Sequence, residues 1–177
     1  MLYTRKGDNG ISGLLGTRGC FPKNSPIYDA LGTLDELNSL LGVCRAFSSR
    51  EKRKIDVARE IKNVQECLFI VQAELAGSSK SILQTHIEEL ERAIGKIEAL
   101  IENPHAFVIP GSNKLSALFD YARSVSRRAE RSVLGEQASQ KVSSQTRVYL
   151  NRLSSLLYAL ARYSAVLGGV KESSPSY

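Results

Sequence analysis

Apolar positions recur at steps of three and four along most of this chain, which is the period of an amphipathic helix. The pattern predicts five helices, which we expect from Thr33 onward and over residues 52–76, 81–102, 112–135 and 142–167. In the second and third of these helices the steps of four and three alternate strictly, which is typical of helices packed at shallow angles in a bundle. We find no strand pattern. The sequence therefore predicts an all-α, five-helix bundle.

Local signals predict the start of the first helix. Thr33 and Glu36 have the Thr-x-x-Glu spacing of a capping box, so we expect this helix to begin at Thr33. Asp35 would then lie in the first turn, where the helix dipole favours a carboxylate. This placement explains Asp35 without any functional role.

The ends of the last two helices carry similar signals. Ser112 is the expected N-cap of the 112–135 helix, and Gly135 is its expected stop. The 142–167 helix should end at the glycine pair that follows it. The polar residues 168–177 should then form a flexible tail.

The first 26 residues lack a sustained apolar period and hold five of the thirteen glycines and two of the five prolines, so they should form a loop-like arm. Glycine lets backbone N–H groups approach an anion, and the arm also carries positive charge. Its basic residues are Arg5, Lys6, Arg18 and Lys23. The spacing matches neither GxxxxGK[ST] nor GxGxxG. Two interpretations stay open: a mobile segment or a phosphate-binding cradle.

One face of the 112–135 helix is rich in arginine. It carries four arginines and one glutamate beside the apolar stripe: Arg123, Arg127, Arg128, Glu130 and Arg131. The face could be merely solvated, with an intrahelical pair between Arg127 and Glu130. However, it draws all its positive charge from arginine, whose planar fork suits bidentate binding of phosphate or carboxylate. We therefore expect an anionic partner.

Composition narrows the class of protein. A chain of 177 residues with 42% hydrophobic residues fits a single domain, 1–177. The net charge of +6 favours anionic partners, yet half of it lies on the arginine-rich face, unlike the dispersed charge of nucleic-acid or membrane binders.

Three widely spaced cysteines form no metal motif and suggest reduced thiols. With no apolar run of about 20 residues and no signal peptide, we expect a cytoplasmic protein.

A short crossover, NPHAFVIPG, separates the third and fourth predicted helices. Pro104 and Pro110 forbid a continuous helix there. On local grounds Phe107 would plug the end of the core.

Three stretches, in order, resemble the PduO-type ATP:cob(I)alamin adenosyltransferases. They are YTRKGDNG with the later Lys23 and GTLDELNSLLG; FVIPG followed by ARSVSRRAER; and YLNRLSSLLYALARY. Together they span residues 3 to 163. The resemblance implies a five-helix bundle that assembles as a homotrimer, with active sites between subunits. It also implies transfer of the 5′-deoxyadenosyl group of ATP to cob(I)alamin, which forms adenosylcobalamin and releases triphosphate.

The resemblance further implies roles for individual residues. The family's ATP-binding positions match Thr4, Arg5, Lys6, Gly7, Ser12, Gly13, Lys23, Arg127, Arg128, Ala129, Glu130, Arg131 and Asn151. Its cobalamin-binding and subunit-interface positions match Asp35, Phe107, Arg123 and Tyr158. Asp35 and Arg123 correspond to a charge pair across the interface, and Phe107 to an aromatic residue under the corrin. Arg127, Glu130 and Phe107 are the expected catalytic residues.

The implied chemistry suits these residue types. Cob(I)alamin, a substrate, attacks C5′ of ATP, so negative charge grows on the departing triphosphate, where arginine, lysine, backbone N–H groups and Mg²⁺ stabilise it. No general base is needed, and we expect no protein-bound metal site.

A flavoprotein reductase and an adenosylcobalamin-dependent enzyme are the expected protein partners. We expect the protein to bind neither nucleic acid nor membrane.

Some positions depart from the family pattern, and rival functions stay open. Ser112 replaces the usual glycine of PGG, Ser155 replaces the usual acid after NRLS, and Tyr158 stands where phenylalanine is frequent. A nucleic-acid-binding helical protein would show affinity that falls steeply with salt. A non-enzymatic carrier would bind cobalamin without consuming ATP.

Overall fold

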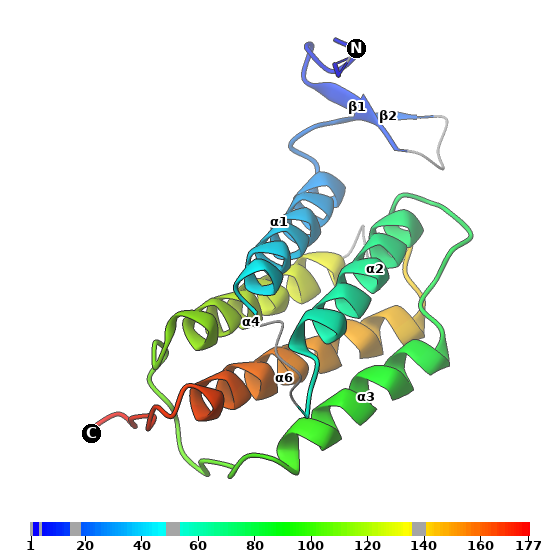
Figure 1. Ribbon diagram of the computed structural model, residues 1–177. Coiled ribbons are helices and arrows are strands. Elements are labelled where there is room, and N and C mark those ends of the chain that lie inside the picture. Colours follow the sequence, from blue (N-terminus) through cyan, green and yellow to red (C-terminus); the bar gives the residue numbers. More distant parts are fainter. Residues whose placement is uncertain (1, 4, 15–18, 49–53, 136–140) are drawn as a thin grey trace.

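The computed structural model describes residues 2–3, 5–14, 19–48, 54–135 and 141–177. Across these ranges the chain forms five helices and a small two-stranded sheet (Figure 1). The helices are α1 (Pro26–Phe47), α2 (Val57–Leu75), α3 (Gln84–Glu98), α4 (Lys114–Val133) and α6 (Ser144–Leu167); the strands are β1 (Ile11–Gly13) and β2 (Cys20–Pro22). The predicted all-α, five-helix bundle is thus confirmed. The antiparallel strand pair was not predicted, because three-residue strands are too short to show a period.

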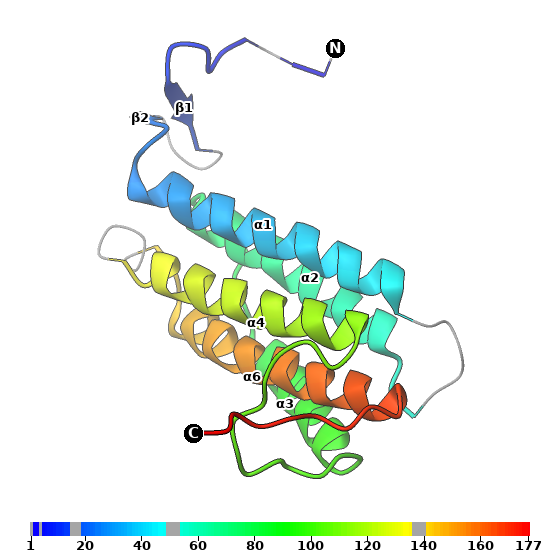
Figure 2. The ribbon, with the colours of Figure 1, turned by 90° about the vertical axis from the view of Figure 1, so that its left-hand side faces the viewer.

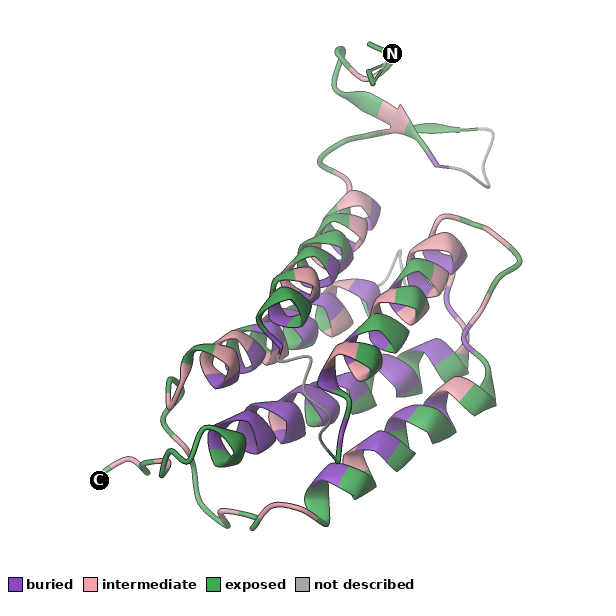
Figure 3. Cartoon of the chain, in the orientation of Figure 1, coloured by how far each residue is buried: buried purple, intermediate pink, exposed green. Residues whose placement is uncertain are grey.

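Two helices form the centre of the bundle. Helix α4 packs against both α1 and α6, while α6 also packs against α3, and α1 against α2. Buried residues face inward on every helix (Figure 3). Every residue of α6 from Ala159 to Ala165 is buried, so α6 is enclosed far beyond the single predicted stripe.

The first helix begins earlier than predicted. It starts at Pro26 after the N-cap residue Ser25, seven residues before Thr33. Proline suits this position because its fixed φ is helical and its missing N–H would have no intrahelical partner. Thr33 lies inside the helix, where its hydroxyl donates to the carbonyl oxygen of Asp29 at 2.7 Å. The capping-box interpretation was therefore wrong, and Asp35 lies outside the first turn.

The other helix ends differ by smaller amounts. Helix α4 is capped by Asn113, whose side chain accepts from the Ser116 N–H at 2.9 Å, so the prediction of Ser112 as N-cap was wrong by one residue. Helix α2 starts at Val57, with Asp56 as its cap, and α3 is shorter than the predicted 81–102. The predicted stop of the last helix at the glycine pair is confirmed.

The two ends of the chain lie at different places on the bundle. The strand pair projects from the start of α1, whereas the chain after α6 runs back beside the crossover between α3 and α4 (Figure 2). Residues of this last segment contact the bundle: the Ile109 N–H donates to the Ser173 carbonyl oxygen at 2.8 Å, and Glu172 lies against Arg162.

A buried carboxylate joins α2 to the start of α6. Glu74 is 7% exposed and accepts hydrogen bonds from the Ser143 backbone N–H at 2.8 Å and from the Thr146 hydroxyl. Substitution by alanine leaves the buried Thr146 hydroxyl and the half-buried Ser143 N–H without this acceptor, so Glu74→Ala should lower the free energy of unfolding by about 2 kcal/mol in urea titrations. Glu66→Ala is the control, because Glu66 is exposed and its ion pair contributes at most about 1 kcal/mol. Equal stability of the two variants would contradict this account of Glu74.

Candidate active site

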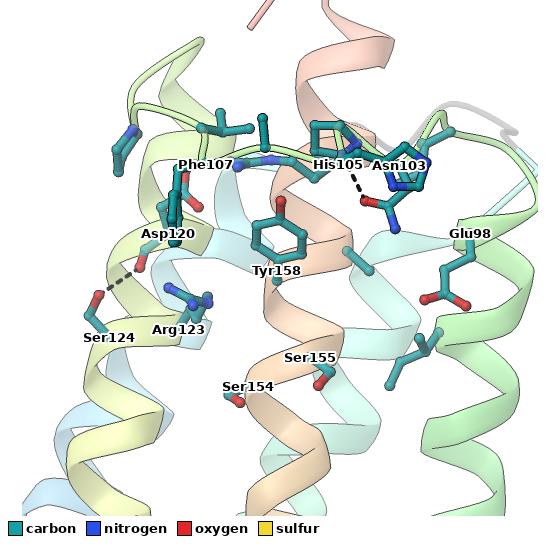
Figure 4. Close-up of a pocket in the computed structure, with 18 of the residues that line it drawn as sticks. Glu98, Asn103, His105, Phe107, Asp120, Arg123, Ser124, Ser154, Ser155 and Tyr158 are labelled. Carbon is teal, nitrogen blue, oxygen red and sulfur yellow. Dashed lines mark hydrogen bonds and ion pairs between the residues drawn. The ribbon is translucent and has the colours of Figure 1, made fainter. Parts of the chain in front are cut away.

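A cleft of about 1020 Å³ opens where α3, α4 and α6 meet the crossover (Figure 4). Helix α4 contributes Asp120, Arg123, Ser124 and Arg127; α6 contributes Ser154, Ser155, Tyr158, Ala159 and Arg162; the crossover contributes residues 103–108 and Pro110. Charged, polar and aromatic groups thus surround one large volume. A cleft of this kind suits a large ligand that has both flat apolar surface and hydrogen-bonding groups.

The crossover presents Phe107 to this cleft. The side chain is 79% exposed, so the local expectation that it plugs the core was wrong. The preceding His105 has a positive φ of 46°, a conformation rare for a residue with a Cβ, and its N–H donates to the Asn103 side chain at 3.3 Å. A turn between Asn103 and His105 therefore shapes the chain just before Phe107. An exposed phenylalanine at the mouth of a cleft is available to a ligand.

Tyr158, on the cleft wall, lies close to two arginines. The guanidinium carbons of Arg123 and Arg162 lie 5.6 Å and 4.8 Å from the centre of its ring, within the range of cation–π attraction. Both guanidinium groups therefore help to hold the ring in place. Figure 4 shows its hydroxyl directed toward the crossover.

A buried ion pair supports this wall. Arg162 is 2% exposed, and its Nη2 donates to Oδ2 of Asp120 at 2.7 Å. Burial raises the pKa of the Asp120 carboxyl, and the guanidinium of Arg162 opposes that effect. Neither residue was predicted from the sequence. The available signal was an arginine within the apolar run of the last helix, since a buried arginine needs an acidic partner.

The arginine-rich face of α4 divides into separate contacts. Arg127 lines the cleft, while Arg128 forms an ion pair with Glu36 of α1. Glu130 accepts from the Asn151 side chain at 3.1 Å, which brings together two of the predicted ATP-binding residues from different helices. Ala129, also predicted to bind ATP, is fully buried, so its side chain packs in the core.

A second contact orients Asn151. Its Oδ1 accepts from Nη1 of Arg152 at 3.0 Å, and Nε of Arg152 in turn lies 3.1 Å from Oε1 of Glu91. Since the amide oxygen is engaged by Arg152, the amide nitrogen faces Glu130. The result is a polar row across α4, α6 and α3. Arg131 is exposed near the end of α4.

The N-terminal arm brings three of its predicted site residues, Ser12, Gly13 and Lys23, together in one hairpin. Ser12 and Gly13 pair with Phe21 and Cys20, and the Lys23 N–H donates to the Gly10 carbonyl oxygen at 2.9 Å. The Lys23 side chain passes so close to Gly7 that a Cβ there would lie 2.8 Å from its Nζ.

The hairpin is tied to α1, because the Tyr28 hydroxyl donates to the Ser12 carbonyl oxygen at 2.5 Å. Arg5 is exposed and lies over Tyr3, and Lys6 is also exposed. Thr4 and Arg18 lie outside the described residues.

Not all predicted site residues come together in one chain. The arm and the crossover, whose residues line the cleft, lie on opposite sides of the bundle in both views (Figures 1 and 2). Asp35 is exposed on α1, whereas Arg123 lies in the cleft on α4. A single chain thus presents two separate halves of the predicted site.

Comparisons with known proteins agree with this architecture. A family model described as cobalamin adenosyltransferase matches residues 2–164. A corrinoid adenosyltransferase of Citrobacter freundii is 36% identical over 168 residues, which cover 91% of this chain and 93% of the relative. One from Bacillus subtilis is 33% identical, covering 96% of this chain and 89% of the relative.

The fold also matches a solved structure. It is a phenylalanine-to-histidine variant of a PduO-type ATP:corrinoid adenosyltransferase from Lactobacillus reuteri, complexed with cobalamin and ATP. The TM-score is 0.90 at 26% identity, covering 99% of this chain and 97% of that chain. Within the described ranges, no helix has the length and apolar character that a membrane span requires. By its sequence over most of its length, the chain belongs to the cobalamin adenosyltransferase family.

Proposed function

We propose that this protein transfers the 5′-deoxyadenosyl group of ATP to cob(I)alamin, forming adenosylcobalamin and releasing triphosphate. The observation that carries the proposal is a cleft of about 1020 Å³ that is bounded by Phe107 and Tyr158 and opens onto Arg123 and Arg127 of α4. A corrin ring is broad and apolar on its faces and carries amides at its edge, so it suits such a wall. The relatives named as corrinoid adenosyltransferases support the same activity.

The ATP half of the site consists of the arm and the polar residues of α4 and α6. In the reaction the cobalt of cob(I)alamin attacks C5′, the C5′–O bond breaks, and the triphosphate leaves with the bonding electrons. Arg127 and the basic residues of the arm stabilise this charge, and Asn151, held by Glu130, orients the nucleotide. The protein contributes position and electrostatic stabilisation, because the nucleophile is the corrinoid itself.

We propose that Mg²⁺ arrives with the nucleotide. Among the described residues, no group of three or more histidine, cysteine, aspartate or glutamate side chains is placed to hold a metal ion. Mg²⁺ on nucleotides is often held chiefly by substrate phosphates and water. The ion would add positive charge beside the leaving group without a dedicated protein cage.

The corrin half of the site depends on Phe107. An apolar ring below cobalt excludes water or another lower ligand. Loss of that ligand eases reduction of cob(II)alamin to cob(I)alamin, because the extra electron enters an orbital directed along the axial position. Ser155 at the cleft leaves room and a hydroxyl where the family usually has an acid.

We also propose that the active enzyme is a homotrimer with its sites between subunits. Support comes from the separation, within one chain, of the arm from the crossover that lines the cleft. In the assembly the arm of one subunit would meet the cleft of its neighbour, and Asp35 would pair with Arg123 across the interface. Light scattering during size-exclusion chromatography tests the subunit number: a monomer that is fully active would overturn this assembly.

We propose a cytoplasmic location, where a flavoprotein reductase and an adenosylcobalamin-dependent enzyme would act before and after this one. Cys20, Cys44 and Cys67 are all free thiols, which suits a reducing compartment. Burial raises the pKa of Cys44 to about 12, so this thiol resists oxidation. Cell fractionation tests the location.

The arm provides a prediction about ATP affinity. An alanine Cβ at Gly7 would displace the end of the Lys23 side chain, which is flexible and moves without strain on the fold. Gly7→Ala should therefore weaken ATP binding about tenfold, the equivalent of one charge-assisted hydrogen bond, while the unfolding midpoint stays unchanged. Titration calorimetry measures the affinity. Gly95→Ala is the control because a Cβ at Gly95 meets no atom within 4 Å; equal ATP affinity in both variants would contradict the role of Lys23.

The activity itself is tested by mixing the purified protein anaerobically with chemically reduced cobalamin, Mg²⁺ and ATP. We expect ATP-dependent loss of the cob(I)alamin spectrum and appearance of a photolabile adenosyl product. Binding of cobalamin and ATP without conversion would favour the carrier function. Failure to bind either, together with salt-sensitive binding of DNA or RNA, would favour the nucleic-acid-binding function.

A further inference from the structure

The segment after α6 returns to the bundle through a tight turn. Gly169 has a positive φ of 63°, which glycine adopts without strain, and the Val170 N–H donates back to the Ala165 carbonyl oxygen at 3.2 Å. This turn directs the following residues along the crossover that carries Phe107 (Figure 2). The course of the tail is thus set by the end of α6.

Two residues of the tail hold the crossover. The Ser173 carbonyl oxygen accepts from the Ile109 N–H at 2.8 Å, two residues after Phe107. Oε1 of Glu172 accepts from the Ser112 hydroxyl at 3.3 Å, directly after the crossover. Both contacts attach the second half of the crossover to the tail.

Glu172 is itself fixed by a buried arginine. Its Oε1 lies 3.0 Å from Nε of Arg162, whose side chain is only 3% exposed. The contact is close enough for an ion pair, but Nε has no well-aligned hydrogen-bond acceptor. Arg162 therefore serves two carboxylates, Asp120 and Glu172, and burial raises the pKa of both.

Arg162 also connects the tail to the cleft. Its guanidinium stacks on Tyr158, which lines the cleft wall. Phe107, by contrast, is 79% exposed and gains little positioning from its own packing. The placement of its ring must therefore come from the backbone contacts of the crossover.

We propose that Glu172 is a positioning residue for the corrin site: by docking on Arg162 it places the tail against the crossover and so holds Phe107 at the mouth of the cleft. This inference rests on the proposed function, because Phe107 matters only if a corrinoid binds there. Glu172 does not touch the reacting atoms in this account. It acts through the Ser112 and Ile109 contacts.

The test uses the full chain with Glu172→Ala and, as a control, Lys171→Ala, which changes an exposed neighbour. Hydrogen exchange, followed by mass spectrometry, reports on the Ile109 amide without requiring any ligand. We expect exchange in residues 105–111 to rise about tenfold in Glu172→Ala and not in Lys171→Ala. Electron paramagnetic resonance of the protein with cob(II)alamin and ATP should show several-fold less of the four-coordinate species. ATP affinity should stay at its wild-type value, and the protein should stay folded, with a modestly lower unfolding midpoint, because Arg162 keeps its hydrogen bond to Asp120.

A conservative variant separates charge from shape. Glu172→Gln keeps an acceptor for Ser112 but loses the ion pair with Arg162, so exchange and four-coordinate cob(II)alamin should be intermediate between wild type and Glu172→Ala. Unchanged exchange in Glu172→Ala would overturn the docking, and raised exchange with a wild-type cob(II)alamin spectrum would overturn the positioning role. If the wild-type protein fails to bind cob(II)alamin, the proposed function fails, and this inference with it, before any variant is compared.

Discussion

Arg127→Ala is expected to lower the rate of adenosyl transfer by about 10²- to 10³-fold, the usual effect of removing one preorganised group that stabilises charge in the transition state. Arg127 lines the cleft and is exposed, so its loss should change the stability of the bundle by no more than about 0.5 kcal/mol. The departing triphosphate is more negative at the reacting oxygen in the transition state than in bound ATP. A guanidinium beside it therefore lowers the barrier. Single-turnover rates with saturating ATP, together with urea titrations, measure both quantities.

Further variants separate the possible causes. Arg127→Lys keeps the charge but loses the planar fork, so it should recover part of the rate. Glu130→Ala should likewise slow turnover strongly without unfolding the bundle, because Glu130 holds the Asn151 amide. Arg92→Ala, an exposed arginine of α3 outside the cleft lining, should keep wild-type activity. Full activity in both Arg127→Ala and Glu130→Ala would remove these residues from the site.

The helices were predictable where the apolar stripe and the caps agree. The limits of α4 and α6 lie within two residues of the prediction, because long stripes end at clear stop signals in both. For α1 the Thr33 capping box predicted the wrong first residue, since the same residues also fit inside a helix. The correct signal was Ser25 followed by Pro26, an N-cap with proline at the first helical position.

The support of the cleft was not predictable from local patterns. Asp120 and Arg162 are 42 residues apart, and Glu172 lies in a segment that composition marks as flexible. Which acid meets a buried arginine depends on how α4 packs against α6. The sequence can indicate that Arg162 needs a partner, but tertiary packing selects it.

The candidate site was only partly accessible to reasoning from residue types. The arginine-rich face indicated an anion, and the structure places Arg127 beside the cleft but commits Arg128 to Glu36. For Phe107, local apolarity favoured the core, whereas the family resemblance placed it at the corrin. The structure leaves the ring exposed at the mouth of the cleft, on a crossover that two prolines keep out of helix.

Phe107→Ala is expected to reduce formation of four-coordinate cob(II)alamin by about ten- to a hundred-fold. Burial of a phenylalanine side chain against a ligand contributes about 1.5 to 3 kcal/mol, which corresponds to that range. Without the ring, water or the lower ligand can return to cobalt, and reduction to cob(I)alamin becomes harder. Electron paramagnetic resonance and absorbance of the protein with cob(II)alamin and ATP measure the coordination state.

Because Phe107 is 79% exposed in the free protein, the substitution should leave both folding and ATP affinity unchanged. Phe69→Ala is the matched control: Phe69 is also exposed, at 62%, but lies on α2 outside the cleft lining. Phe107→Leu keeps apolar bulk and should retain part of the four-coordinate species. A wild-type spectrum in Phe107→Ala would mean that some other group excludes the lower ligand, and Tyr158, held over the same cleft by two arginines, would be the next residue to test.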